Sequence, residues 1–393
     1  MYRFLLITGY VFLSPPVFSQ RIVTIGEAVN LSLQNKINLS ASALEVQQQN
    51  LLYKATAVFN NPDVDLEQSP YEGLLIGIQQ RLNLPAVYAS QKALQREKIQ
   101  LSLLMQQLNQ NDIKRLTKSN YLQIQYLTAR VQLLTSQDSL YQSIKIAANR
   151  NFAAGQINKL QELFAAKEAD KIGNELSRAS IDLHAQEIAF SYITGFNKPF
   201  KVEPLRTTFI DNVAIISADT SLNTTQQQIF MQQVNIAQQQ LKVQRAELLP
   251  SFTAGPLFPL SRDYKTAVGF RVGVSVPIWA GRNKARINAA KTSVLLAEAQ
   301  RQNASRNYLQ EYQLTYANLL KEKSSLVYFN SIALQQSREM SETALRLFDA
   351  GQTDYTELLR IIISAFETRI TYLETLKNYH QAFINLNYLT GNL

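Results

Sequence analysis

The sequence contains no cysteine and only two histidines, His184 and His380, in 393 residues. Disulfides and thiolate metal ligation are therefore excluded, so the fold must be stabilised by packing and assembly. Beyond residue 20, no run of about 18 apolar residues occurs without charges, which excludes a bundle of membrane-spanning helices. The glycines have no phosphate-loop context, and no Ser-His-Asp arrangement is indicated. We therefore expect no catalytic site, no cofactor and no bound metal.

The segment 1–19 has the pattern of a secretion signal. A positive head ends at Arg3, and an apolar run follows over 4–13. The run is shorter than the roughly 20 apolar residues that a spanning helix needs, and a proline pair ends it. We expect cleavage after Ser19. No cysteine follows, so a lipid anchor is not expected, and the exported chain must hold to its membrane in another way.

The formal net charge is +9, but the basic residues are scattered among Gln, Asn and Glu along the chain. A nucleic-acid groove usually needs a basic stripe interleaved with aromatic residues. The sequence has no such stripe, and the predicted export also argues against one. We expect no nucleic acid as a partner.

The two halves of the chain share one register. The pentapeptide that begins at Phe152 recurs with one substitution from Phe348 (348 − 152 = 196), and the two histidines obey the same offset. We therefore predict two structural repeats, 20–195 and 224–393. A connector over 196–223, with one or two short strands, joins them. We interpret the histidines as helix-end residues rather than as metal ligands.

Long helices dominate the prediction. Residues 83–154 and 279–350 are each compatible with one helix on the order of 100 Å long. Their narrow apolar stripes are typical of helices that bury one seam against neighbours and keep the opposite face in water. A shorter helix is predicted over 27–60, with Thr24 as N-cap and Glu27 as capping-box partner. Another is predicted over 158–192. We expect two short helices to stack end to end beside one long helix.

Each half carries two strand candidates between its first helix and its long helix. The clearest covers 267–277, where apolar residues alternate with Gly269, Arg271, Gly273 and Ser275. Trp279 follows, as in the aromatic girdles of membrane barrels. The other candidates cover 62–67, 74–79 and 251–258. Because about eight strands are needed to close a membrane barrel, a chain with four must oligomerise, whether as two copies or as three.

Several motifs, in their order and duplication, resemble the TolC-type outer-membrane efflux family. They are Ile25-Gly26-Glu27-Ala28, the helix end from Arg245 to Pro250, the strand exit from Val274 to Arg282, and Leu347 to Gln352. The resemblance implies a mainly α chain with a small membrane β-barrel portion. It further implies a homotrimer with a twelve-stranded barrel, continued by a long helical barrel. The implied location is the outer membrane of a Gram-negative bacterium, with the helices extending into the periplasm.

The resemblance also implies roles for particular residues. The tips at Gly155, Gln156, Gly351 and Gln352 would dock a periplasmic adaptor (membrane fusion) protein, and Asp354, Glu357 and Arg360 would form the pore constriction. Arg360 departs from the acidic ring that is usual in the family, and we hypothesise that it holds the gate shut through an ion pair with Glu357 of the same or a neighbouring chain. The predicted barrel lumen holds Asp63, Asp65, Glu67 and Arg271, as a cation path or simply as solvated residues. Trp279 would anchor the chain at the interface with outer-membrane lipid.

The function favoured by the sequence is a passive exit duct for an inner-membrane pump of the resistance-nodulation-division type. The chain is compact and has no expected lipid anchor, and in this it resembles ducts paired with heavy-metal pumps. Metal cations are therefore the first substrate hypothesis. Drug efflux or type I protein secretion would use a similar tube. A structural or adhesive coiled-coil protein of the envelope is the alternative from another class.

Overall fold

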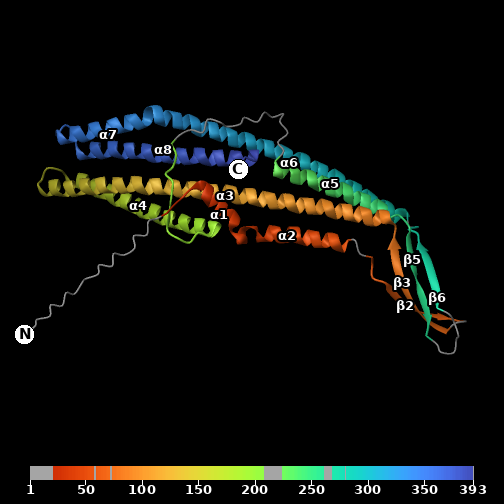
Figure 1. The fold of residues 1–393 in the computed structure, drawn as a ribbon. Helices are drawn as coiled ribbons and strands as arrows, with labels where there is room; N and C mark the ends of the chain where they lie inside the picture. Colours follow the sequence, from red (N-terminus) through yellow and green to blue (C-terminus); the bar gives the residue numbers. More distant parts are fainter. Residues whose placement is uncertain are drawn as a thin grey trace, which may run out of the picture.

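The computed structural model describes residues 21–56, 59–70, 73–207, 224–260, 268–278 and 280–392. The molecule is elongated, with helices lying along one axis and a sheet at one end (Figure 1). In these residues, no helix combines the length and the apolar character needed to cross a membrane. The predicted secretion signal and Trp279 lie outside the described residues.

The first half contains the helices α1 (Ile25–Gln34), α2 (Lys36–Ala55), α3 (Pro85–Ala153) and α4 (Lys159–Thr194). Helix α3 has 69 residues, which at 1.5 Å per residue gives a length of about 100 Å, as predicted. Its proline stands in the first turn, where the missing N–H has no helical partner to lose. Helices α2 and α4 both pack along α3. The amide of Asn38 donates to the backbone oxygen of Ile193 (2.8 Å), so the two short helices meet end to end, as expected.

The prediction of one helix over 27–60 is wrong, because the chain breaks at Asn35. Thr24 is the N-cap of α1 as predicted, and its hydroxyl accepts from the Glu27 amide (3.2 Å). The Glu27 side chain does not complete a capping box and instead pairs with Arg21. Asn35 caps α2 by accepting from the Ile37 amide, and it also donates to the Tyr192 carbonyl oxygen (3.2 Å). Asparagine readily makes such local bonds in place of helical ones.

The second half contains α5 (Thr225–Ala246), α6 (Ala280–Tyr328), α7 (Leu334–Asp349) and α8 (Tyr355–Thr390). A π-helical turn, Phe329–Ala333, joins α6 to α7. The predicted long helix over 279–350 is therefore a continuous rod with one irregular turn. Figure 1 shows the rod changing direction near the start of α7.

Element boundaries near the tip end recur at one offset. Helices α3 and α7 end at residues 153 and 349, α4 and α8 begin at 159 and 355, and each of the latter two has 36 residues. Within each pair, the two boundaries are separated by the same offset as the repeated pentapeptide. The glycines that follow these helices, Gly155, Gly195, Gly351 and Gly391, all have positive φ angles, a conformation that glycine adopts without a steric penalty.

All four strand candidates form one antiparallel sheet, in the order β2 (Asp63–Ser69), β3 (Gly73–Asn83), β5 (Ser251–Pro259) and β6 (Gly269–Ser275). The central β3–β5 pair joins the two halves of the chain. The short segment 70–72 connects β2 to β3, whereas the longer segment 260–268 connects β5 to β6. The extra length of the second half therefore falls in a hairpin connection.

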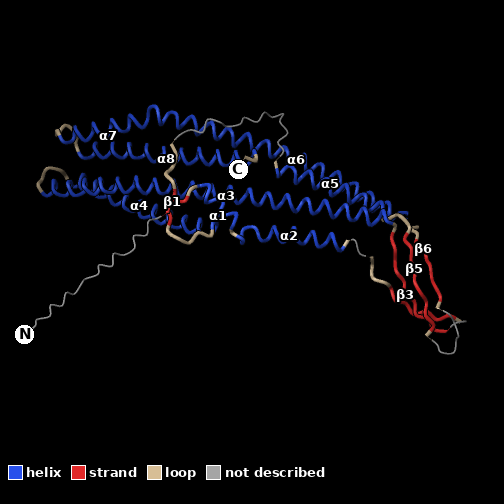
Figure 2. Tube along the Cα trace, viewed as in Figure 1, coloured by secondary structure: helices blue, strands red, loops and turns tan. Residues whose placement is uncertain are grey.

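A two-stranded parallel ribbon lies near the middle of the helices, where Figure 2 labels β1. It pairs β1 (Arg21–Val23) with β4 (Phe200–Val202). Strand β4 is the expected short strand in the connector, while β1 was not predicted and 208–223 lie outside the described residues. The buried Tyr121 hydroxyl of α3 donates to Val23 O (2.8 Å) and accepts from Glu203 N (2.9 Å). One tyrosine thus ties both strands of this ribbon to α3.

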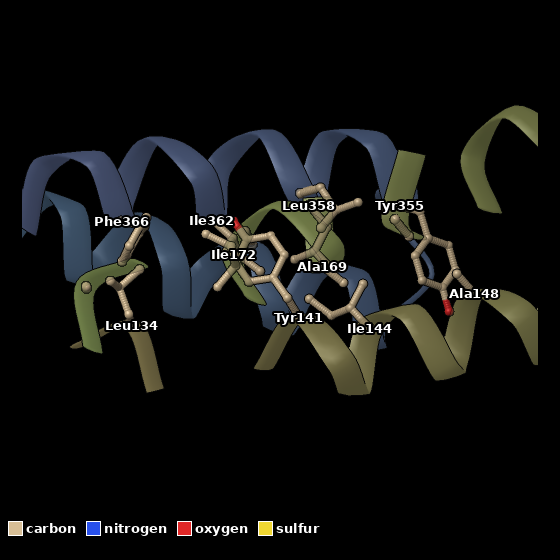
Figure 3. Packing of buried hydrophobic residues seen from close by; sticks show 14 residues of the cluster. Leu134, Tyr141, Ile144, Ala148, Ala169, Ile172, Tyr355, Leu358, Ile362 and Phe366 are labelled. Carbon is tan, nitrogen blue, oxygen red and sulfur yellow. The ribbon is translucent and has the colours of Figure 1, made fainter. Parts of the chain in front are cut away.

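The largest core cluster lies toward the tip end and fuses the two halves. Figure 3 shows Leu134, Tyr141 and Ile144 of α3 facing side chains of α4 and α8. Leu359 is fully buried in this cluster. Burying such a leucine contributes about 2 kcal/mol relative to leaving it exposed.

Candidate functional site

Both helical hairpins end in the same tight turn at the tip. Gly155 has a φ of 71°, and the Gln156 amide donates to the Asn151 carbonyl oxygen (2.8 Å). In the second tip, Gly351 has a φ of 67°, and the corresponding amide of Gln352 makes the equivalent bond (2.9 Å). This pattern satisfies the last carbonyl groups of a helix. A Cβ atom at either glycine would meet nothing within 4 Å. The four residues predicted for docking therefore form two exposed, well-defined turns.

The two tips are tied to each other by residues that the sequence did not single out. The Asn151 amide of α3 donates to the Tyr355 hydroxyl of α8 (2.7 Å). The Tyr355 ring packs edge-on against Phe348, with ring centroids 4.6 Å apart. Burial raises the pKa of Tyr355, so its hydroxyl stays protonated near neutral pH. These contacts fix the spacing between the tips.

The three predicted constriction residues lie in the first turns of α8, with two different roles. Asp354 is the N-cap, and its carboxylate accepts from the Glu357 amide (2.9 Å). Arg360 donates to both carboxylate oxygens of Glu357, at 3.0 and 2.5 Å. The hydrogen bonds from Arg360 lower the pKa of Glu357. The predicted ion pair therefore forms within one chain. The cap was not predicted, although the D-x-x-E spacing is typical of a helix N-terminus.

The sheet has one apolar face and one polar face. Because paired residues on neighbouring strands share a face, the register places even-numbered residues of all four strands together. On this face Phe270 is 69% and Val272 66% exposed. The members with large apolar side chains include Val64, Leu66, Leu74, Ile76, Ile78, Phe252, Phe258, Phe270, Val272 and Val274. An exposed apolar surface of this kind indicates contact with lipid or with another protein.

The polar face gathers the charged residues that were predicted to line a lumen. Arg271 of β6 reaches Asp65 of β2 (2.9 Å) and also pairs with Glu67. The side chain crosses two intervening strands, which present Gly255 opposite Arg271 and Gly77 opposite Asp65. A Cβ at Gly77 would lie 2.6 Å from an Asp65 carboxylate oxygen. Glycine thus leaves room for this bridge across the sheet.

Asp63 stands apart from this bridge and faces Arg81 (3.8 Å). The described residues of the polar face thus bring three of the four predicted lumen residues into direct contact. Of the histidines, His184 is exposed, with Nδ1 3.8 Å from Glu187. His380 Nε2 lies 2.8 Å from the Arg206 carbonyl oxygen, and burial lowers the pKa of His380.

Comparisons with known proteins agree with this geometry. Residues 220–392 match the family model described as outer membrane efflux protein. The second half of the chain is therefore similar to the outer membrane efflux protein family. The resemblance stated from the motifs, and with it the outer-membrane location, is therefore confirmed. No curated protein matches the chain in sequence.

Solved channel structures share the fold over nearly the whole chain. The Campylobacter jejuni CmeC outer membrane channel has a TM-score of 0.80 at 12% identity and covers 94% of this chain and 85% of its own. The structure of CusC has a TM-score of 0.80 at 17% identity, and the match covers 93% of this chain and 91% of CusC. The open state of the Neisseria gonorrhoeae MtrE channel has a TM-score of 0.76 at 13% identity, with 93% and 88% covered. The expected mainly helical fold with a small β portion is confirmed, and the family is one of efflux channels rather than enzymes.

Proposed function

We propose that this efflux-family protein is the passive exit duct of a tripartite pump, in which three copies form one continuous tube. The observation that carries the proposal is the four-stranded sheet with an exposed apolar face, joined directly to helices about 100 Å long. Such a sheet fits a membrane on its apolar face and water on its polar face. The helices fit an aqueous tunnel that extends away from that membrane.

The strand directions support ring closure. The strands alternate in direction from β2 to β6, so β6 of one copy is antiparallel to β2 of the next. Unpaired strand edges do not occur in lipid, and closure removes them. Three copies, as the family resemblance implies, give a barrel of 3 × 4 = 12 strands. Each copy contributes the repeats 20–195 and 224–393, which the connector 196–223 joins.

The tips are assigned to the docking of a periplasmic adaptor, which links the tube to an inner-membrane pump of the resistance-nodulation-division type. Support comes from the exposed, matching turns at Gly155–Gln156 and Gly351–Gln352. The Glu357–Arg360 pair, at the same end, is assigned to the closed constriction, with Asp354 beside it as the helix cap. Asp63, Asp65, Glu67 and Arg271 are assigned to the lumen of the barrel, and Trp279 to its lipid interface.

Heavy-metal cations are the substrate class that we propose to test first, with drugs and secreted proteins as the alternatives. This choice rests on the family resemblance. A strain that lacks its own duct, supplied with this chain and a metal pump, should regain tolerance to the exported metal. Restored tolerance to drugs alone would overturn the metal assignment and leave the duct intact.

Trimer formation and conductance test the duct itself. The purified protein should run as a heat-resistant trimer on a semi-denaturing gel and should conduct ions in planar bilayers. Val272→Arg, on the apolar face, should abolish insertion, since a cation facing lipid costs roughly 2–4 kcal/mol per copy at the midplane. Thr253→Arg, at nearly the same level on the polar face, is the matched control and should retain it. A monomer that stays soluble without detergent would refute the proposal and favour a structural coiled-coil protein.

A further inference from the structure

A band of cations borders the sheet on the first turns of two long helices. It consists of Lys92, Arg96 and Lys98 of α3 together with Arg282, Lys284 and Arg286 of α6, and we refer to these six residues as the basic belt. All but the half-buried Lys92 are exposed. They lie near the starts of α3 and α6, within about 21 Å of the first residue of each helix. Cations from both repeats of the sequence thus gather at the sheet end of the helices, where α5 packs against both α3 and α6.

The cations of the basic belt have no acidic partners in the described part of the chain. The carboxylate that accompanies them, Glu97, accepts a hydrogen bond from the Gln232 amide (2.6 Å). Helix α6 has no acidic residue before Glu298. Arg96 donates to the uncharged Tyr53 hydroxyl (3.1 Å). The belt therefore carries six positive charges against the one negative charge of Glu97, and no carboxylate neutralises them within the described residues.

Three lysines at the tip end of α3 and α4 have different surroundings. They are neutralised locally in the pairs Lys145–Asp170 (2.7 Å), Lys159–Glu162 (2.5 Å) and Lys167–Glu168 (3.4 Å). The cations of the basic belt differ from these three lysines, because none of them is paired with a carboxylate in the described residues.

Helix stability does not account for the belt. The N-terminal turn of a helix already carries partial positive charge, so cations are unfavourable there. Arg282 nevertheless lies in the first turn of α6 and Lys284 at the start of the second, and the first turn has no acidic residue. Their placement is understandable if an anionic surface lies beside the turn.

The belt is continuous with the apolar face of the sheet. Strand β3 ends at Asn83 and α3 starts at Pro85, while β6 ends at Ser275 and α6 starts at Ala280. If the apolar face lies among acyl chains, as the proposed function requires, the belt lies at the level of the head groups on the periplasmic side. Basic residues beside a membrane segment attract anionic lipids.

We propose that the basic belt binds the phosphate groups of anionic phospholipids in the leaflet from which the helices emerge. This inference rests on the proposed function, because it requires the sheet to lie in a bilayer. The belt sets the depth of the tube in the membrane. The apolar face holds the protein among the lipid acyl chains, and the cations hold it at the lipid phosphate groups. The attraction is electrostatic and is therefore weakened by salt.

The test measures lipid preference directly in the reconstituted full-length protein. Spin-labelled phosphatidylglycerol and phosphatidylcholine are compared in vesicles, and the relative association of each label with the protein is read from its immobilised fraction. The wild-type protein should prefer phosphatidylglycerol at least about threefold at low salt, and about 0.5 M salt should remove most of the preference, because the Debye length falls well below about 10 Å.

Two variants decide the matter. Changing all six belt residues to Gln should abolish the preference, whereas Lys145→Gln, Lys159→Gln and Lys167→Gln together, at the tip end, should leave it unchanged. If the sixfold variant does not assemble, the three changes in α3 and the three in α6 are tested separately, and each should lower the preference. A preference that is equal in wild type and belt variants overturns the proposal.

Trimer formation and conductance, measured on the same samples, separate this test from that of the duct. A conducting trimer without lipid preference refutes the belt proposal alone, and the absence of a wild-type trimer refutes the proposed function. Belt variants that keep the lipid preference but alter ion selectivity overturn the proposal in favour of a charged ring that faces the lumen.

Discussion

The two halves of the chain share the helix boundaries near the tip at one constant offset, yet equivalent positions have different surroundings. Leu359 is fully buried, whereas Leu163, its equivalent, is 52% exposed. Glu357 and Arg360 form an ion pair, whereas their equivalents are Gln161 and a phenylalanine. Caps and helix lengths follow local sequence, while burial follows from which helices lie beside each one. The duplicated register therefore preserves the backbone and leaves the chemistry of each half free to differ.

The sharpest test of this comparison removes one leucine from each half. Leu359→Ala should destabilise the protein by about 2–5 kcal/mol, because it leaves a cavity in the core cluster of the tip end. Leu163→Ala should cost much less. Thermal unfolding followed by far-ultraviolet circular dichroism in detergent measures both as shifts in Tm. Equal losses would show that a neighbouring copy covers Leu163 and would break the comparison.

Tyr121 provides the next largest difference between the halves, since its equivalent position is Ala317. Tyr121→Phe removes a hydroxyl that bonds Val23 O and Glu203 N, and should cost about 1–3 kcal/mol by leaving these groups unpaired. Hydrogen exchange at the β1–β4 ribbon should rise at the same time. Tyr126→Phe is the control, because that buried hydroxyl makes one long bond of 3.4 Å to Glu374. A larger loss of stability in Tyr126→Phe than in Tyr121→Phe would refute the role given to the Tyr121 hydroxyl.

These contrasts explain how much the sequence could predict. The Thr24 cap, the glycine turns and all four strands follow from local rules of capping, φ angle and side-chain alternation. The break at Asn35 does not, because it depends on a bond to Ile193, which is near the end of another helix and far away in the sequence.

In the candidate site, too, contacts between residues close in sequence could be predicted, and contacts between distant segments could not. The Glu357–Arg360 pair was predictable, because a spacing of three on a helix brings side chains together. The contact between Asn151 and Tyr355 was not, and neither was the Arg271 bridge to Asp65, since each joins distant segments. The basic belt was not predicted for a similar reason, because its two parts belong to different repeats and reach the same end of the molecule only through the fold, on helices that both pack against α5.

A pair of glycine substitutions tests where the halves should behave alike. Gly155→Ala and Gly351→Ala should each destabilise the protein by about 1–2 kcal/mol, because alanine is disfavoured at positive φ. Neither adds a steric clash, so the two shifts in Tm should be equal. An effect confined to one tip would show that the turns are not equivalent in the assembled protein.

The smallest expected effect concerns pH at the tip. The hydrogen bonds from Arg360 hold the pKa of Glu357 below its ordinary value of about 4.5. A lowered carboxyl pKa means that the ion pair contributes fully above the unfolded value and is lost as pH falls through the folded value. Under the proposed constriction, wild-type conductance in planar bilayers should therefore rise as the pH falls through the lowered pKa of Glu357.

Arg360→Ala should raise conductance at neutral pH and remove this acid step, because Glu357 then has no partner to release. Arg346→Ala is the matched control, since that exposed arginine bonds within its own helix, to the Glu342 carbonyl oxygen and the Thr343 hydroxyl. The pair is a contact of exposed side chains, so Tm should barely move in either variant. Unchanged conductance in Arg360→Ala would mean that the difference between the halves at this position has no part in closing the pore.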